Sequence, residues 1–223
     1  MWEETWNDIL NGGHPRWKID DKRANKETAL GHITKHLSKD ATKILCPLAG
    51  DDSFVHLAWT KGFHVTTIDL VPAAVAAMRE QFGPDWTRQD RDDGMVVWKH
   101  DSARATLYEG NALSVLPELK GSFDAVYDKD SFGALEKGIR SDYCARLADY
   151  TKEGAILYVE VKLMAEGHPQ RDTGPPYSVD EETIINNFGN AFDYVTNLDE
   201  VYPLWRPGMW QTGHLLKRNS KHM

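Results

Sequence analysis

Helical and extended patterns of apolar residues alternate along most of this chain. Continuous apolar runs predict strands that are buried on both faces, as the strands of a parallel sheet are. The expected strands are Ile44–Leu48, Val65–Asp69, Ala105–Glu109, Phe123–Asp128 and Ala155–Val161, with a final pair near 192–201 and 210–217. The repeated strand-helix units predict one α/β domain over residues 1–223, with a Rossmann-like, doubly wound and mostly parallel sheet, helices on both faces and an antiparallel C-terminal strand.

Helices are expected between these strands, where apolar residues recur at helical spacing. Their ends carry recognisable signals, because Gly62 stops one helix and Pro72 stands at the first position of the next. The polar stretch 85–104 is interrupted by Met95-Val96-Val97-Trp98, which predicts an inserted hairpin. The expected helices are 26–38, Ser53–Lys61, Ala73–Phe82, Ser141–Tyr150 and Asp180–Phe188.

Ligands of open α/β sheets bind beyond the carboxyl ends of the strands. Gly50 follows the first strand and Asp69 ends the second, at the spacing of about 20 residues that is typical of a nucleoside site. A bland alternative is that Asp69 only precedes a helix. Gly50 lacks the further glycines that admit a pyrophosphate, so a phosphate-free nucleoside is favoured over NAD. The rule selects the loops that contain Leu48, Gly50, Asp69, Leu70, Asn111, Ala112 and the segment Asp128–Phe132.

Composition and charge narrow the choice of partner. The chain has 26 Lys and Arg residues against 34 Asp and Glu residues, a net charge of −8, which argues against a nucleic-acid binder and favours a small molecule. The two cysteines have no metal-type spacing, and the pair His32 and His36 lacks a third ligand, so no metal is expected. No signal peptide or membrane span is visible. We expect a cytoplasmic monomer that binds no membrane.

Several segments resemble the thiopurine methyltransferase family. The paired prolines are the most specific mark, and the resemblance runs from residue 2 to about residue 216. It is carried by Trp2-Glu3-Glu4-Thr5-Trp6, Leu45-Cys46-Pro47-Leu48-Ala49-Gly50-Asp51, Gly62-Phe63-His64-Val65, Tyr108-Glu109-Gly110-Asn111-Ala112, Phe123-Asp124-Ala125-Val126-Tyr127-Asp128-Lys129 and Gly174-Pro175-Pro176-Tyr177-Ser178-Val179.

The resemblance implies that S-adenosylmethionine is the cofactor and that sulfur or another soft nucleophile accepts the methyl group. Asp69 would hold the ribose, and the tryptophan-rich segment 1–25 would form a lid over the site. Taking the strand-end rule and the resemblance together, we expect the cofactor to contact Trp2, Trp6, Leu48, Gly50, Asp69, Leu70, Asn111, Ala112 and Lys129, and the acceptor to contact Trp17, Phe132, Lys162, Pro175, Pro176, Tyr177 and Trp210.

One step of the family pattern differs here. Where the family has aspartate, arginine and glycine, this chain has Asp128, Lys129 and Asp130. The ammonium group of a lysine is a mobile point charge, whereas the guanidinium group of an arginine is planar and can donate two parallel hydrogen bonds. Lys129 and Asp128 are the candidate catalytic residues. Lys129 and Lys162, with Arg171 or Arg206, could bind an anionic acceptor such as a sulfur-containing carboxylic acid. Alternatively, these cations could lie at the rim of the site without binding the acceptor.

Three classes of function remain open from the sequence. The first is methyl transfer to a small thiol or thioether, or to a halide or bisulfide ion as in a branch of the same family. The second is an NAD-type oxidoreductase, which the missing glycines disfavour. The third is a non-catalytic nucleoside-binding protein that shares the fold.

Overall fold

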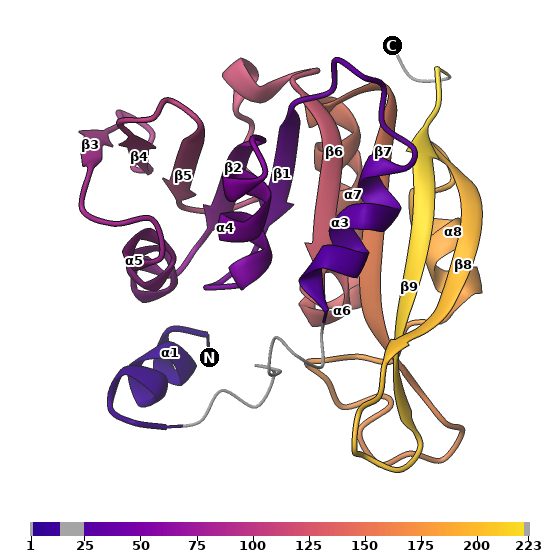
Figure 1. The fold of residues 1–223 in the computed structure, drawn as a ribbon. Helices are drawn as coiled ribbons and strands as arrows, with labels where there is room; N and C mark the ends of the chain where they lie inside the picture. The colour runs from indigo at the N-terminus through magenta and orange to yellow at the C-terminus, as the bar shows by residue number, and fades with distance from the viewer. Residues whose placement is uncertain (1, 14–24, 221–223) are drawn as a thin grey trace.

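Nine strands form one sheet in the computed structural model, which describes residues 2–13 and 25–220. Their order across the sheet is β3-β4-β5-β2-β1-β6-β7-β9-β8 (Figure 1). In chain order the strands are β1 (Lys43–Pro47), β2 (His64–Asp69), β3 (Trp86–Asp90), β4 (Val96–His100), β5 (Ala105–Glu109), β6 (Phe123–Lys129), β7 (Thr151–Met164), β8 (Phe192–Tyr202) and β9 (Met209–Arg218).

The central strands β5, β2, β1, β6 and β7 pair in parallel, and both edges of the sheet are antiparallel. At one edge β9 pairs antiparallel with β7 and with β8. The predicted α/β class, with a parallel core and an antiparallel C-terminal end, is therefore confirmed. The predicted hairpin is present as β3 and β4, but it is not a separate excursion, because β4 pairs with β5 and continues the sheet.

Helices cover both faces of this sheet (Figure 1). Apolar residues of α3, α4 and α5 pack on one face, and those of α6, α7 and α8 pack on the other. The helices are α1 (Trp2–Leu10), α3 (Lys26–Thr34), α4 (Ser53–Thr60), α5 (Pro72–Glu80), α6 (Ser131–Ala134), α7 (Arg140–Tyr150) and α8 (Glu181–Phe188), with 3-10 turns at Pro117–Leu119 and Lys137–Ile139.

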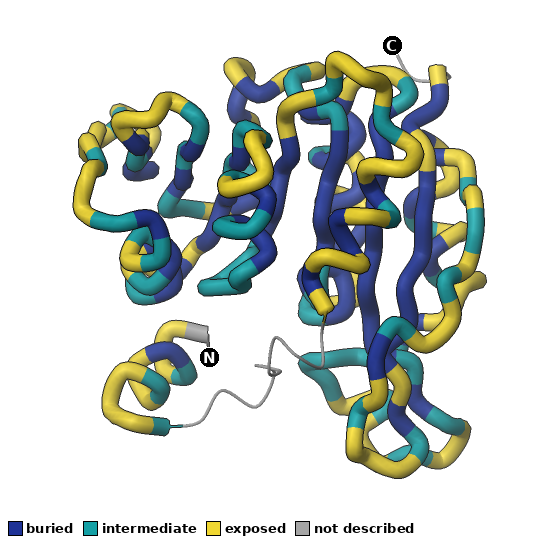
Figure 2. The backbone as a smooth tube through the Cα atoms, in the orientation of Figure 1, coloured by how far each residue is buried: buried dark blue, intermediate teal, exposed yellow. Residues whose placement is uncertain are grey.

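Most element boundaries lie within a few residues of those predicted from the sequence. The largest differences are that α3 ends at Thr34 and not at residue 38, and that β7 runs from Thr151 to Met164 where a shorter strand was expected. The extension of β7 has a physical cause, because its far end pairs with β9 and is buried even at polar positions such as Lys162. Figure 2 shows the resulting run of buried backbone along β1, β6, β7 and β9.

The carboxyl ends of the parallel strands all reach one end of the sheet, and α1 lies beyond that end (Figure 1). Helix α1 is fixed there by Trp6, which packs with Val71 and Ala74 at the start of α5. The connections at 165–180 and 203–208 lie at the same end of the molecule (Figure 1). Within the part of the chain that the structure describes, no helix is long and apolar enough to span a membrane.

Candidate functional site

The turn after β1 and the acid at the end of β2 form one hydrogen-bonded unit. Gly50 adopts a left-handed backbone with φ +55°, and its N–H donates to Asp69 Oδ2 at 3.0 Å. The other carboxylate oxygen of Asp69 accepts the N–H of Val71 at 3.0 Å. Burial raises the pKa of Asp69, and the N–H donors of Val71, Gly50 and Leu70 oppose that rise. The predicted juxtaposition of Gly50 and Asp69 is therefore present.

This unit fits a nucleoside that bears a ribose diol. The two oxygens of Asp69 accept backbone N–H groups, and a carboxylate has about four lone-pair sites, so acceptor capacity is left for a hydroxyl group. Above the turn, the Trp6 ring is so close that a Cβ added at Gly50 would stand 3.2 Å from Trp6 Cζ2. Glycine is thus needed at position 50 both for its conformation and for the approach of the ring.

The other predicted cofactor residues surround this turn with different exposure. Leu48 has φ +48° and donates its N–H to the carbonyl oxygen of Ile68, whereas the Leu70 side chain is largely exposed. Ala112 is buried, and the side-chain oxygen of Asn111 accepts the N–H of Leu113 within a local turn. Such a bond is what an ordinary turn would contain, and it leaves the amide nitrogen of Asn111 for a ligand.

Two of the predicted aromatic residues cannot be placed. Trp17 lies outside the described residues, and Trp2 begins α1 but its side chain is outside the described part of the structure. Their predicted contacts with the cofactor and the acceptor stay predictions. Trp6 is placed, and its side chain is 5% exposed and lies over the turn at Gly50.

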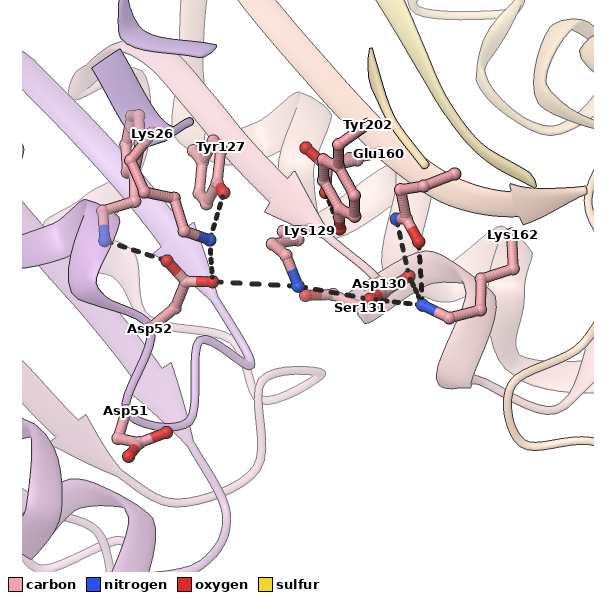
Figure 3. A network of polar contacts seen from close by, with 12 residues as sticks. Lys26, Asp51, Asp52, Tyr127, Lys129, Asp130, Ser131, Glu160, Lys162 and Tyr202 are labelled. Atoms are coloured by element: carbon pink, nitrogen blue, oxygen red, sulfur yellow. Dashed lines mark hydrogen bonds and ion pairs between the residues drawn. The ribbon is translucent and has the colours of Figure 1, made fainter. Parts of the chain in front are cut away.

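A chain of alternating charges runs from the start of α3 to β9, across the carboxyl ends of β1, β6 and β7 (Figure 3). The first link is an ion pair of 2.7 Å between Lys26 Nζ and Asp52 Oδ2. Asp52 also caps α4 through the N–H of Phe54 and lies 3.9 Å from Lys129 Nζ. Burial would raise the pKa of Asp52, but Lys26 and Lys129 hold it below its ordinary value.

Asp130 is the second carboxylate of this chain, and it holds two lysines. Its oxygens lie 2.8 and 2.9 Å from Lys162 Nζ and 3.3 Å from Lys129 Nζ, and Gln211 Nε2 donates to it at 3.0 Å. Burial would raise the pKa of Asp130, but Lys162 and Lys129 hold it well below its usual range. Burial would likewise lower the pKa of Lys129, yet Asp130 and Asp52 raise it.

Glu160 is a further acid beside this chain, and its partners are hydroxyl groups. Its oxygens accept hydrogen bonds from Tyr202 OH at 2.7 Å and Tyr158 OH at 2.9 Å. Burial raises the pKa of this carboxyl group. The sequence analysis missed Lys26, Asp52, Glu160 and Gln211 as site residues, because each looks like a helix start, a cap or part of an apolar strand, and no spacing links them.

Asp128 occupies a different environment from its neighbour Lys129. Successive residues of a strand point to opposite faces, so Asp128 lies on the α6 and α7 side of the sheet. Its carboxylate is fully buried and accepts hydrogen bonds from Tyr143 OH at 2.7 Å and from the N–H of Phe132 at 3.0 Å. Burial raises the pKa of Asp128 to about 7. These contacts suit a residue that positions α6 more than one that touches an acceptor.

Only some of the residues predicted to contact the acceptor lie near the charge chain. Lys162 belongs to the charge chain, and Phe132 is fully buried against Phe188, with ring centroids 5.0 Å apart. The half-buried prolines at positions 175 and 176 lead to Tyr177, whose N–H donates to the carbonyl oxygen of Gly133 in α6 at 2.9 Å.

Three other predicted residues lie apart from the charge chain. Trp210 lines a groove of about 400 Å³ at the β8–β9 connection, and Arg206 lines the same groove. The Arg171 guanidinium donates to the carbonyl oxygen of Met164. Among the described residues, the side-chain hydrogen bonds and ion pairs of Lys129 and Asp130 are made with Asp52, Lys162 and Gln211 and with each other, not with these three residues.

The order of the strands and the helices on both faces of the sheet identify a Rossmann-like methyltransferase fold. The chain aligns with the solved structure of Burkholderia thailandensis 1,6-didemethyltoxoflavin-N1-methyltransferase, which contains S-adenosylhomocysteine, at a TM-score of 0.68 and 16% identity over 98% of this chain and 89% of that one. A glycopeptide N-methyltransferase in complex with S-adenosylmethionine aligns at a TM-score of 0.59 and 14% identity, over 93% and 99% of the two chains. At these identities the two structures show the fold alone.

Sequence comparison gives the family. The sequence model described as Thiopurine S-methyltransferase (TPMT) matches residues 1–211. Proteins named thiopurine S-methyltransferase are similar to the chain in Gluconobacter oxydans, with 28% identity over 87% of this chain and 82% of the relative, and in Acinetobacter baylyi, with 26% identity over 70% of each. The chain belongs to the thiopurine S-methyltransferase family, and it is an S-adenosylmethionine-dependent S-methyltransferase that acts on a small molecule.

Proposed function

We propose that this protein transfers a methyl group in line from S-adenosylmethionine to the sulfur atom of a small thiol or thioether. The observation that carries the proposal is the closed unit of Gly50, Asp69 and Val71 beneath Trp6, at the carboxyl ends of the parallel strands. The cofactor supplies a methyl group on a sulfonium centre. Asp69 is proposed to accept hydrogen bonds from its ribose, and Gly50 allows the close approach of its nucleoside.

The protein contributes mainly by positioning and by excluding water. Holding the acceptor sulfur in line with the methyl carbon can supply about 7–11 kcal/mol of the barrier. The Trp6 ring provides an electron-rich face for a sulfonium cation, a contact worth about 0.5–2 kcal/mol. We propose that α1 acts as the lid that brings this ring over the cofactor; residues 14–24 of the predicted lid segment 1–25 lie outside the described residues.

The structure supports no assignment of a general base. A thioether needs none, and a thiol reacts as its thiolate, which nearby ammonium groups favour. Asp128 accepts hydrogen bonds from Tyr143 and Phe132 on the opposite face of the sheet from Lys129. We therefore propose that Asp128 positions α6 and that Lys129 contributes only its charge to the site.

An acceptor screen with methyl-labelled cofactor tests this function. The panel contains a thiopurine, since the curated relatives carry that name, together with alkyl and aryl thiols, thioethers, iodide and bisulfide. We expect labelled S-methyl product from at least one organic sulfur compound and none in the Asp69→Ala variant at low cofactor concentration. Label found only on an inorganic anion would favour the halide and bisulfide alternative, and absence of transfer to every compound would contradict the proposal.

A further inference from the structure

Each ammonium group of the charge chain at the carboxyl ends of β1, β6 and β7 has a carboxylate partner within the chain. The charge chain contains three ammonium groups, those of Lys26, Lys129 and Lys162, and each of them contacts a carboxylate of the chain. Glu160 adds a third carboxyl group beside Asp52 and Asp130. The lysines are therefore not free cations waiting for an anionic acceptor, as one reading of the sequence suggested.

Lys162 has no donor left for a ligand. An ammonium group has three N–H donors, and Lys162 Nζ contacts both oxygens of Asp130 at 2.9 and 2.8 Å and Gln211 Oε1 at 2.9 Å. Lys129 is held between Asp130 at 3.3 Å and Asp52 at 3.9 Å. An acceptor carboxylate would have to compete with these two aspartates for the same ammonium groups.

Exposure adds a second and independent argument. The side chains of Asp130 and Asp52 are 17% and 15% exposed, whereas those of Lys129 and Lys162 are 9% and 6% exposed. The two aspartate side chains are therefore more exposed than the two lysine side chains. An anionic group that enters beside Asp130 meets a like charge in a poorly solvated place, where repulsion is strong.

We propose that Asp130 is a specificity-determining residue, which makes the site select uncharged sulfur acceptors and reject acceptors that bear a carboxylate. This inference rests on the proposed methyl transfer to sulfur and goes beyond it by naming the charge class of the acceptor. Asp130 contacts Lys129 and Lys162 and offsets part of their charge, so its removal leaves two ammonium groups with one fewer counter-charge.

The test compares two thiols of nearly equal shape, 4-sulfanylbenzamide and 4-sulfanylbenzoate. The measured quantity is the ratio of their kcat/KM values, amide over acid, because the comparison between variants cancels any difference in thiol reactivity. We expect a ratio well above one in the wild-type protein and a fall of at least about tenfold in Asp130→Asn, which keeps the side-chain shape and removes the charge.

Further variants separate charge from structure. Asp130→Gly suits the left-handed backbone at this position, where φ is +61°, and is expected to lower the ratio in the same direction. The double variant Asp130→Asn with Lys162→Gln restores the charge balance and should return the ratio toward the wild-type value. The matched control is Asp90→Asn, which removes one exposed carboxylate from the β3 strand and should leave the ratio unchanged.

Several results would overturn the proposal. They are wild-type protein that methylates the acid faster than the amide, an unchanged ratio in both Asp130 variants, or an equal effect of Asp90→Asn. If the wild-type protein binds cofactor but methylates neither thiol, the result counts against the proposed methyl transfer to sulfur and not against the role of Asp130. Calorimetric affinities of the two compounds for the S-adenosylhomocysteine complex then give the same charge comparison, and preferential binding of the acid contradicts the role of Asp130.

Discussion

The replacement of Asp69 by alanine should have two effects that can be measured separately, a loss of folding stability and a loss of cofactor affinity. In the folded protein the two carboxylate oxygens accept the N–H groups of Gly50 and Val71, each at 3.0 Å. We propose that the same carboxylate binds the ribose of the cofactor. A hydrogen bond to a charged group is worth about 1.5–3 kcal/mol, so the loss of a single one weakens binding about tenfold to 150-fold.

Calorimetry with S-adenosylhomocysteine measures this loss, and circular dichroism shows whether the variant is folded. The matched control is Asp180→Ala, because Asp180 also accepts a backbone N–H, that of Thr183 at 2.8 Å, where it caps α8. Loss of this cap should cost about 1 kcal/mol of folding free energy without changing cofactor affinity. Asp69→Ala protein that binds within threefold of wild type, or an equal loss in Asp180→Ala, would refute the assigned role of Asp69.

Three further predictions concern the surroundings of this turn. Gly50→Ala should lower the free energy of unfolding by about 1–2 kcal/mol, because it strains a left-handed residue and places a Cβ 3.2 Å from Trp6 Cζ2. Chemical denaturation measures this loss. In the double variant Gly50→Ala, Trp6→Ala the part of the loss that comes from the steric contact should disappear. Trp6→Ala alone should weaken S-adenosylhomocysteine binding by a larger factor than it lowers the midpoint of urea unfolding, and an unchanged affinity would argue against the lid. Burial raises the pKa of Asp128 from the ordinary 3.8 to about 7, so the stability that its protonated form contributes is complete below about pH 4 and is lost as the pH rises through 7. The free energy of unfolding, relative to Asp128→Asn, should fall by up to about 4 kcal/mol across that window. A difference that does not change with pH would show that the buried carboxyl group is not protonated.

The sequence predicts the parallel core well, because each buried strand is a continuous apolar run with a clear start and end. It also predicts the pairing of Gly50 with Asp69, since parallel strands bring their carboxyl ends together. It does not predict that the hairpin extends the sheet. The β3 strand is mostly exposed, and an exposed strand carries little hydrophobic signal about its partner.

The contacts of the charge chain could not be predicted from the sequence. Lys26 and Asp52 are 26 positions apart, and Asp130 and Gln211 are 81 positions apart, so no local spacing connects them. Each residue also has an ordinary local explanation, such as the cap that Asp52 provides for α4. Only the register of β6, β7 and β9 brings these side chains to one end of the sheet.

A single-turnover reaction with cofactor that carries a ¹³C-labelled methyl group tests the central claim most directly. The protein is mixed with one equivalent of labelled cofactor and excess 4-sulfanylbenzamide, and NMR follows the labelled carbon. We expect one S-methyl product for each S-adenosylhomocysteine formed. Label on nitrogen or oxygen, or cofactor that stays intact in the presence of every sulfur compound of the acceptor panel, would contradict it.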